Sequence, residues 1–280
     1  MTPRRSFIAC IALLALLGAS CGEYTDGSAS AREFPEAAAP STSPSPSPRE
    51  FLEVGDVETA HETAQIVQAA APAPKSIERW GWALRAKASR LNVYDDPNGG
   101  TTLRMSIDAL NPWGQRIAFP IRGVRVRGDT TWYRILLGIE PNGSNGWVKG
   151  DDVTFDRIRH RVVVDLSERT LRHYRDGKLR HRFSVGIGAP GTPTTVGRFF
   201  VWAHLDPRDA SGPYGSYLLG LSGFSKVLTY WPGGGRMAIH GTADPTDRGR
   251  QVSYGCPRVF NPQMNKLRGI PMGTTVVIRR

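Results

Sequence analysis

The feature that most constrains the fold of this chain is a succession of short alternating segments separated by turn dipeptides. Between residues 77 and 152, the stretch RIAFPIRGVRVRGDTTWYRILLGIEPNGSNGWVKGDDV alternates apolar and polar positions and is interrupted by Gly-Asp and Asn-Gly turns. Further on, Val162, Val164 and Leu166 alternate, and Arg-Asp-Gly-Lys separates two more segments of this kind. Asn-Gly and Asp-Gly between alternating segments are strong local signals for β-hairpins. The sequence therefore predicts a mainly β fold.

The alternating segments form two groups. Residues 76–154 predict a small β-barrel, because regular short strands this close together favour closure of a sheet. Residues 155–280 predict a second, mostly β domain with one or two short helices. In FNPQMNKLRGI, Asn261 is predicted as a helix N-cap, Pro262 as part of the first turn and Gly269 as the stop. The last segment, GTTVVIRR, predicts a closing strand.

The first twenty residues have the pattern of an export signal. Arg4 and Arg5 precede an apolar run over residues 7–17, which is too short to span a bilayer as a stable anchor. Small residues then lead into Cys21. Small residues followed by Cys are similar to the lipobox of bacterial lipoproteins, which implies lipidation of Cys21. Ordinary signal cleavage near this position is the alternative.

Residues 21–75 predict a disordered, acidic and Pro-rich tether. From residue 22 to 74 the chain holds nine acidic residues and two arginines, and its Pro, Ser and Ala content cannot bury enough apolar surface to offset ordering. The remainder after this tether carries a net charge of +16. For an exported protein, this charge favours an anionic cell-wall polymer or membrane over nucleic acid; a solvated basic surface without a dedicated ligand is the alternative. We expect a monomeric, membrane-anchored lipoprotein that faces the cell wall.

Cys256 is the one cysteine left once the signal and the lipidation candidate are set aside. Cys10 lies within the export signal, so Cys256 has no predicted disulfide partner. A lone cysteine is commonly a buried, inert residue, but an unpaired thiol in an exported protein is exposed to oxidation and mispairing. In SYGCPRV, the preceding Gly255 leaves room for a substrate, and Arg258 favours a thiolate. These features predict a nucleophile.

The base that such a nucleophile needs is predicted to be His240. It ends the apolar segment RMAI, precedes Gly241 and stands sixteen residues before Cys256, a separation that suits a strand, a loop and a returning strand. The other histidines are weaker candidates: His160, His173 and His181 lie in Arg-rich segments and are expected to be solvated, His204 is ambiguous, and His61 falls in the tether.

The segments around His240 and Cys256 resemble a known family. IHGT (239–242) followed by SYGCPRV is similar to the signature of the L,D-transpeptidases with a YkuD-like catalytic domain, and VGIGAPGTPTTVGRF (185–199) is similar to their Gly-rich segment. The resemblance implies a YkuD-like β-sandwich over residues 155–280. For residues 76–154, WYRILL and NGSNGWVKGDDV resemble bacterial Src-homology-3-like domains, which implies a wall-binding or spacer module.

The family resemblance also implies roles for single residues. Cys256 would be the nucleophile and His240 its base, and Gly241 would orient the His240 ring through its carbonyl. The backbone N–H groups of Tyr254, Gly255 and Cys256 would stabilise an oxyanion. Two further residues complete the set: Ser253 would support the loop, and Arg258 would contact a substrate carboxylate or shape the loop. The family pattern has His in place of Tyr254 and a branched aliphatic residue in place of Pro257, and we expect the site to tolerate both changes.

The function implied is acyl transfer on peptidoglycan stem peptides. A thioester on Cys256 would be resolved by an amine of a neighbouring stem, which cross-links two third-position diamino acids without any metal or cofactor. Water as the acceptor would instead give an L,D-carboxypeptidase. The rival from another class is a non-catalytic wall-binding lipoprotein. A metal-dependent wall peptidase is disfavoured, because the sequence has no HExxH and no other close pair of metal ligands.

Overall fold

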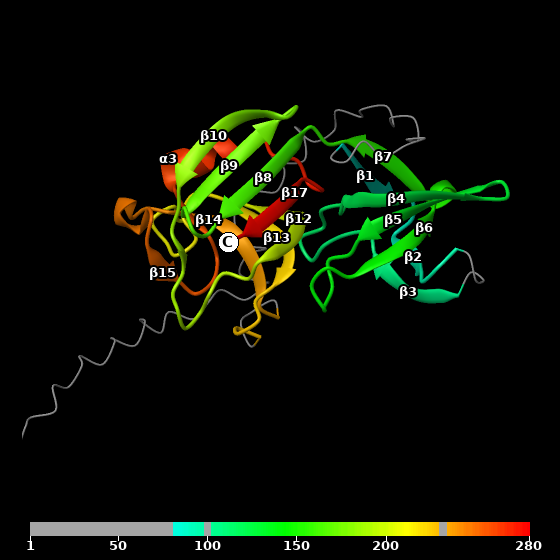
Figure 1. The fold of residues 1–280 in the computed structure, drawn as a ribbon, viewed down its shortest axis with the longest axis horizontal. Coiled ribbons are helices and arrows are strands. Elements are labelled where there is room, and N and C mark those ends of the chain that lie inside the picture. Colours follow the sequence, from blue (N-terminus) through cyan, green and yellow to red (C-terminus); the bar gives the residue numbers. More distant parts are fainter. Residues whose placement is uncertain (1–80, 98–101, 230–233) are drawn as a thin grey trace, which may run out of the picture. The chain divides into compact units, whose positions relative to one another are not determined.

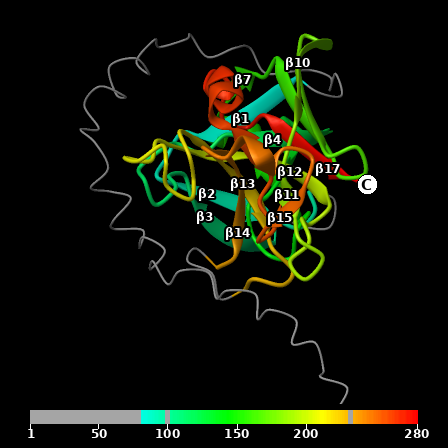
Figure 2. The same ribbon diagram turned by 90° about the vertical axis from the view of Figure 1, so that its left-hand side faces the viewer.

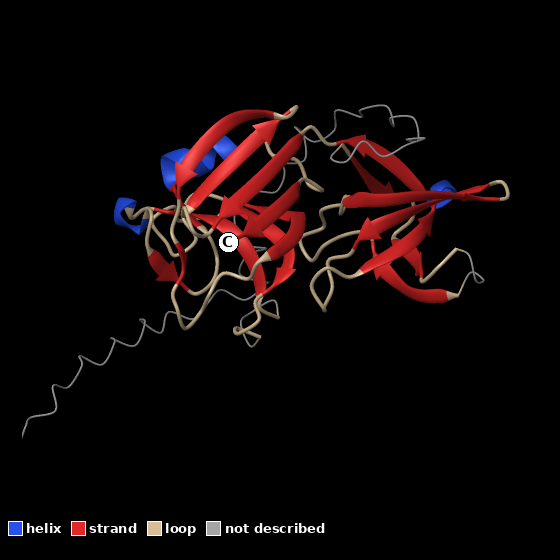
Figure 3. Ribbon diagram, in the orientation of Figure 1, coloured by secondary structure: helices blue, strands red, loops and turns tan. Residues whose placement is uncertain are grey.

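The structure is a computed structural model that describes residues 81–97, 102–229 and 234–280 of the 280-residue chain (Figure 1). Strands dominate these residues, and the few helices are short (Figure 3). The predicted fold class, mainly β with short helices, is confirmed. The predicted export signal and tether, including Cys21, lie outside the described residues. Within the described ranges, no helix has the length and apolarity that crossing a membrane requires.

The first sheet has seven strands in the order β3-β2-β6-β5-β4-β1-β7. Its strands are β1 (Trp82–Ala86), β2 (Arg90–Tyr94), β3 (Leu103–Asp108), β4 (Phe119–Arg127), β5 (Thr130–Leu136), β6 (Asn145–Lys149) and β7 (Val153–Arg157). All neighbouring strands are antiparallel. The Gly-Asp turn expected from the sequence joins β4 to β5, and Gly128 takes the positive φ of 53° that favours glycine there.

The second sheet has eight strands in the order β10-β9-β8-β17-β12-β13-β14-β16. Its strands are β8 (His160–Asp165), β9 (Thr170–Arg175), β10 (Lys178–Ser184), β12 (Gly197–Leu205), β13 (Leu218–Phe224), β14 (Arg236–Thr242), β16 (Arg258–Phe260) and β17 (Thr275–Arg279). A separate parallel pair consists of β11 (Ile187–Gly188) and β15 (Gln251–Ser253), visible in Figure 2. The predicted hairpin at Asp176 and Gly177 is confirmed, and both residues have positive φ.

The C-terminal strand occupies a central place in this sheet. β17 pairs in parallel with β8 and antiparallel with β12. The last strand of the chain therefore joins the two halves of the sheet, β10-β9-β8 and β12-β13-β14-β16. Just before it come the short helix α3 (Asn261–Met264) and a 3-10 turn (Asn265–Leu267). The predicted N-cap was wrong: the N-cap is Phe260, and Asn261 is the first helical residue. Its side chain is engaged elsewhere, as the next section describes.

Both faces of the second sheet are buried, but against different partners. Alternate residues of β12 divide between two cores: Phe199 and Val201 join the core that contains Met237 and Ile239 of β14. Phe200 and Trp202 pack instead against side chains of the first sheet. By the same alternation, Arg236, Ala238 and His240 of β14 face the side on which the first sheet lies. We call this side, with Leu218 and Gly220 of β13, the cleft face.

Candidate active site

Two neighbouring parallel strands bring Cys256 beside the cleft face. Strand β16 pairs with β14 so that Arg258 lies opposite His240. Cys256, two residues earlier, therefore lies beside Ala238, and the Ala238 N–H donates to its Sγ at 3.4 Å. The thiol is half-buried and not in a disulfide. The sixteen-residue separation contains the end of β14, a 3-10 turn (Pro245–Asp247) and β15, and the parallel return strand β16 begins two residues after Cys256.

His240 is held by the backbone on its own strand. The residue is 4% exposed, and its Nδ1 lies 2.8 Å from the carbonyl oxygen of Gly241. A carbonyl can only accept, so this contact requires the proton on Nδ1 and leaves Nε2 with the lone pair. The ring of Tyr214 covers His240 edge-on, with 5.5 Å between centroids.

A tight contact fixes the backbone around Gly241, and the sequence-based analysis missed it. Oδ1 of Asn261 accepts from the N–H of Ser216 at 2.9 Å, and its Nδ2 donates to the carbonyl of Ala210 at 2.8 Å. A Cβ on Gly241 would lie 2.4 Å from this Oδ1, and one on Gly215, which has φ of +63°, would lie 2.3 Å from it. Asn261 therefore hydrogen-bonds to both ends of the segment 210–216, which carries Tyr214, and lies in close contact with Gly241, next to His240.

Burial keeps both reacting groups uncharged. Desolvation lowers the pKa of His240 to about 4 and outweighs the opposing effect of hydrogen bonds to the backbone of Gly241 and Tyr214; the charge of Arg258 lowers it further. Desolvation also raises the pKa of the Cys256 thiol, although the Ala238 N–H and Arg258 favour the thiolate. Both shifts favour the neutral thiol and the neutral imidazole over a thiolate–imidazolium pair.

The residues before Cys256 form a hydrogen-bonded bend. Ser253 is 2% exposed, and its Oγ accepts from the Gly255 N–H at 3.1 Å. Its carbonyl accepts from Ala189 N and Thr192 Oγ1 at 2.8 and 3.0 Å. One of the three predicted oxyanion donors, the Gly255 N–H, is therefore occupied in this conformation. The roles predicted for the N–H groups of Tyr254 and Cys256 stay predictions.

Arg258 braces the loop between the two strands. Its Nη1 lies 3.3 Å from Oδ2 of Asp247, a carboxylate that is itself 6% exposed and accepts from Thr242 Oγ1 at 2.9 Å. Within the described part of the chain, Nε of Arg258 is buried and has no hydrogen-bond partner. Of the two roles that the resemblance implies, the ion pair supports loop shaping, and the substrate contact stays a prediction.

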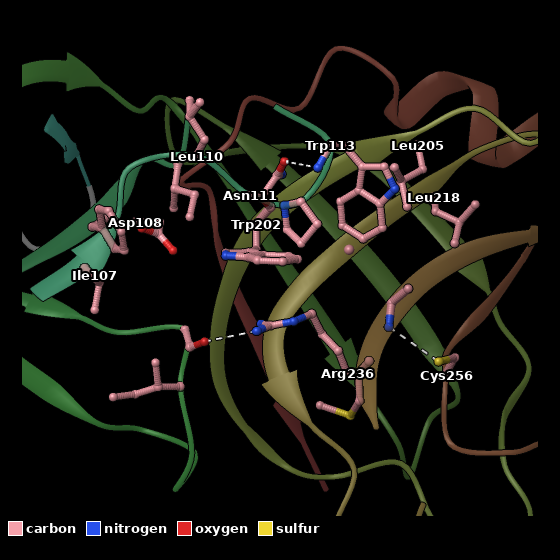
Figure 4. Close-up of a pocket in the computed structure, with 18 of the residues that line it drawn as sticks. Ile107, Asp108, Leu110, Asn111, Trp113, Trp202, Leu205, Leu218, Arg236 and Cys256 are labelled. Atoms are coloured by element: carbon pink, nitrogen blue, oxygen red, sulfur yellow. Dashed lines mark hydrogen bonds between the residues drawn. The ribbon is translucent and has the colours of Figure 1, made fainter. Parts of the chain in front are cut away.

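A cavity of about 890 Å³ opens from Cys256 toward the first sheet (Figure 4). One wall is formed by residues of the cleft face and its surroundings: Trp202, Leu205, Tyr214, Leu218, Gly220, Arg236, Ala238 and Cys256. The opposite wall comes from the first sheet and its connections, chiefly Ile107, Asp108, Leu110, Asn111, Trp113 and Ile139. The nucleophile candidate therefore lies at one end of a largely apolar and aromatic cleft.

The other histidines form a stack, and the expectation that all three are solvated was wrong. His173 is 5% exposed and stacks between His160 and His181. The alternation of β9 turns it inward because Leu171, two residues earlier, belongs to the core. Its pKa is lowered to about 4, chiefly by burial and then by the neighbouring histidines. No group of three or more possible metal ligands occurs among the residues that the structure describes.

Comparisons of this chain with a family model and with known proteins all point to the same family. The model of the YkuD L,D-transpeptidase catalytic domain matches residues 159–278. A Bacillus licheniformis protein named for L,D-transpeptidase YkuD is 35% identical over 124 residues, which cover 44% of this chain and 67% of that protein. A protein of the same name from Bacillus subtilis is 30% identical over 152 residues, which cover 52% and 85%. This chain belongs to the YkuD family of L,D-transpeptidases.

The chain is also similar to a solved Enterococcus faecium L,D-transpeptidase, with 24% identity and a TM-score of 0.33. The match covers 43% of this chain and 50% of the Enterococcus faecium chain. The region before residue 159 is outside the family model.

Proposed function

We propose that this protein is a peptidoglycan L,D-transpeptidase that works through a thioester on Cys256. The observation that carries the proposal is that Cys256, two residues before β16, lies at one end of the cleft while that strand pairs with β14, the strand that carries His240, in a chain of this family. Because the thiol is protonated at rest, its proton must leave as sulfur attacks. The Nε2 lone pair of His240 is the acceptor that we assign.

The first half-reaction removes a terminal residue from the donor stem. Sγ bonds to the carbonyl carbon that precedes the terminal D-alanine, and the thiol proton passes to His240. The carbon–nitrogen bond to D-alanine then breaks, and the leaving amine takes the proton back from His240. The carbonyls of Gly241 and Tyr214, whose hydrogen bonds raise the pKa of His240, favour the transient imidazolium between these steps.

The second half-reaction forms the cross-link. The side-chain amine of a third-position diamino acid attacks the thioester, the carbon–sulfur bond breaks, and the amine proton returns to sulfur through His240. Water in place of the amine would make the protein an L,D-carboxypeptidase. The cavity of about 890 Å³ between Cys256 and the first sheet offers room for a second stem.

The direct test is turnover of tetrapeptide-containing wall fragments by the full chain. We expect release of D-alanine, cross-linked dimers and a transient mass adduct on Cys256, all abolished in Cys256→Ala. Tripeptides without dimers would indicate the carboxypeptidase. Binding without turnover in the wild-type protein would favour a wall-binding lipoprotein, and loss of turnover with chelators would favour a metal-dependent peptidase.

We further propose that the protein is exported and that a lipid on Cys21 anchors it facing the cell wall. We propose that it acts as a monomer, and that its first sheet is a Src-homology-3-like wall-binding or spacer module. The lipobox-like sequence and the acidic tether support the anchor. The mass of the mature N-terminal peptide tests it: a diacylglycerol-modified Cys21 supports the anchor, and an unmodified N-terminus produced by ordinary cleavage contradicts it.

A further inference from the structure

A half-buried arginine lies in the cleft and forms no ion pair with any acidic residue that the structure describes. Arg236 begins β14, two residues before Ala238, whose N–H contacts the thiol. Residues spaced by two on a strand share a face, so Arg236 and Ala238 both line the cavity, about 7 Å apart along the strand. In Figure 4 the Arg236 side chain runs away from Cys256 toward the first sheet.

The surroundings of this guanidinium fix its plane and leave donors available. Its Cζ lies 3.8 Å from the ring centroid of Trp202 and 4.3 Å from that of Phe224. Its Nη2 donates to the carbonyl of Gly138 at 3.1 Å, and Nη1 donates to that of Leu221 at 3.4 Å. An arginine has five N–H donors, so these two bonds do not saturate it. The Trp202 and Phe224 rings hold the planar guanidinium in one orientation.

No carboxylate among the described residues forms an ion pair with Arg236. Burial lowers its pKa to about 10, and Glu140 is the one acidic group that opposes this shift. Asp108, the acidic residue of the cavity wall, pairs with Arg90. A partly desolvated cation that lacks an ionic partner is costly, and such a site gains most from an anionic ligand that also fills its remaining donors.

A donor in the opposite wall of the cavity has no hydrogen-bond partner among the described residues. Nε1 of Trp113 is buried and, within the described ranges, has no hydrogen-bond acceptor. Trp113 lines the cavity and meets Trp202 edge-on, with 5.8 Å between centroids. The N–H groups that Arg236 keeps beyond its two bonds to backbone carbonyls favour a ligand that supplies acceptor oxygens.

We infer that Arg236 binds the free carboxylate on the side chain of the third stem residue, and so selects diaminopimelate-type stems over lysine-type or amidated stems. This inference rests on the proposed function. The carboxylate of the terminal D-alanine lies only about three bonds, roughly 3.5 Å, from the attacked carbonyl. The diaminopimelate side-chain carboxylate lies about six bonds, roughly 7 Å, away, so of the two carboxylates it is the one that reaches further along the cleft, where the Arg236 side chain runs away from Cys256.

The test compares two disaccharide-tetrapeptides that differ only in whether the diaminopimelate carboxylate is free or amidated. For the full-length wild-type protein, we expect kcat/KM about 10- to 100-fold higher on the free acid, the usual range for a hydrogen bond to a charged group. Arg236→Gln should bring the ratio to about 1, because kcat/KM falls much more on the free acid than on the amidated stem. Arg236→Lys, which keeps the charge but loses the planar fork, should retain part of the preference.

The outcomes separate the two proposals. Turnover of neither stem by the wild-type protein would overturn the proposed function. Turnover of both with equal kcat/KM, or a preference that persists in Arg236→Gln, would overturn the role of Arg236. Equal losses on both stems in Arg236→Gln would make it a structural bridge between the sheets. Thermal melting and alkylation of Cys256 by the uncharged reagent iodoacetamide verify that the variant is folded, and Arg236→Lys provides the test if Arg236→Gln is not.

Discussion

The neutral state of the thiol and imidazole makes a sharp prediction for the reactivity of Cys256. With its pKa near 4, about one His240 in a thousand is protonated at pH 7. Burial raises the pKa of the Cys256 thiol above its ordinary value, so the protonated thiol predominates at that pH. Because alkylation proceeds through the thiolate, its rate should rise about tenfold per pH unit. Between pH 6 and pH 8 we expect an increase of about 100-fold.

The assay is the rate at which iodoacetamide modifies Cys256 in the full chain, followed by mass spectrometry of the peptide that contains this residue. A preformed thiolate–imidazolium pair would react at a nearly constant rate over the same range. Arg258 provides a matched control, because its charge favours the thiolate. Arg258→Gln should move the profile to higher pH, and Arg258→Lys should leave it nearly in place. A rate that is already maximal at pH 6 would refute the neutral-pair assignment.

Three further predictions concern the support of the site. Asn261→Ala leaves a buried amide without its acceptor, so we expect a loss of about 1–3 kcal/mol in urea unfolding and slower acylation, with a smaller effect in Asn261→Asp. Gly241→Ala places a Cβ 2.4 Å from the Asn261 Oδ1, and the same titration should show at least a comparable loss. Finally, His173, His204 and His240 have native pKa values of about 4, below the unfolded value near 6.5. The stabilisation that these neutral histidines give the folded state is present above pH 6.5 and is lost as pH falls toward 4. The loss reaches up to about 2 kcal/mol for each histidine at pH 5. Urea unfolding midpoints measured at pH 7 and pH 5 would detect this loss, and an unchanged midpoint would contradict the prediction.

The sequence predicted those parts of the fold that depend on neighbouring residues. Asp176 and Gly177 take the positive φ values that their turn requires, and the alternation of Val162 and Val164 places both in the core. Such signals are local, because a hairpin needs only a turn and two alternating segments. The central position of β17 was not predicted, since its pairing with β8 joins residues more than a hundred positions apart.

The same distinction explains what was missed at the site. Cys256 and His240 were found because their residue types and their spacing carry the chemistry. Asn261 acts on a segment 45 residues away, and Arg236 reaches a carbonyl 98 residues away. Neither contact leaves a local pattern, although Gly215 and Gly241 mark where the backbone must approach closely. In the same way, the inward turn of His173 depends on which face of β9 meets the core.

The two departures from the family pattern fall where the backbone, not the side chain, does the positioning. Tyr254 is 44% exposed, so its ring is not packed between the reacting groups. Pro257 lacks an N–H, but its carbonyl accepts from the His240 N–H at 3.2 Å, a bond that proline can make as well as any residue. The next residue, Arg258, exchanges two backbone hydrogen bonds with Gly186, at 2.8 and 2.9 Å. A chain that had lost its catalytic role would have no need to keep Cys256 against Ala238, on the strand that carries a desolvated histidine, with backbone contacts on both sides of it. The substitutions therefore argue less for a decayed site than for one whose geometry is fixed by strands β14 and β16.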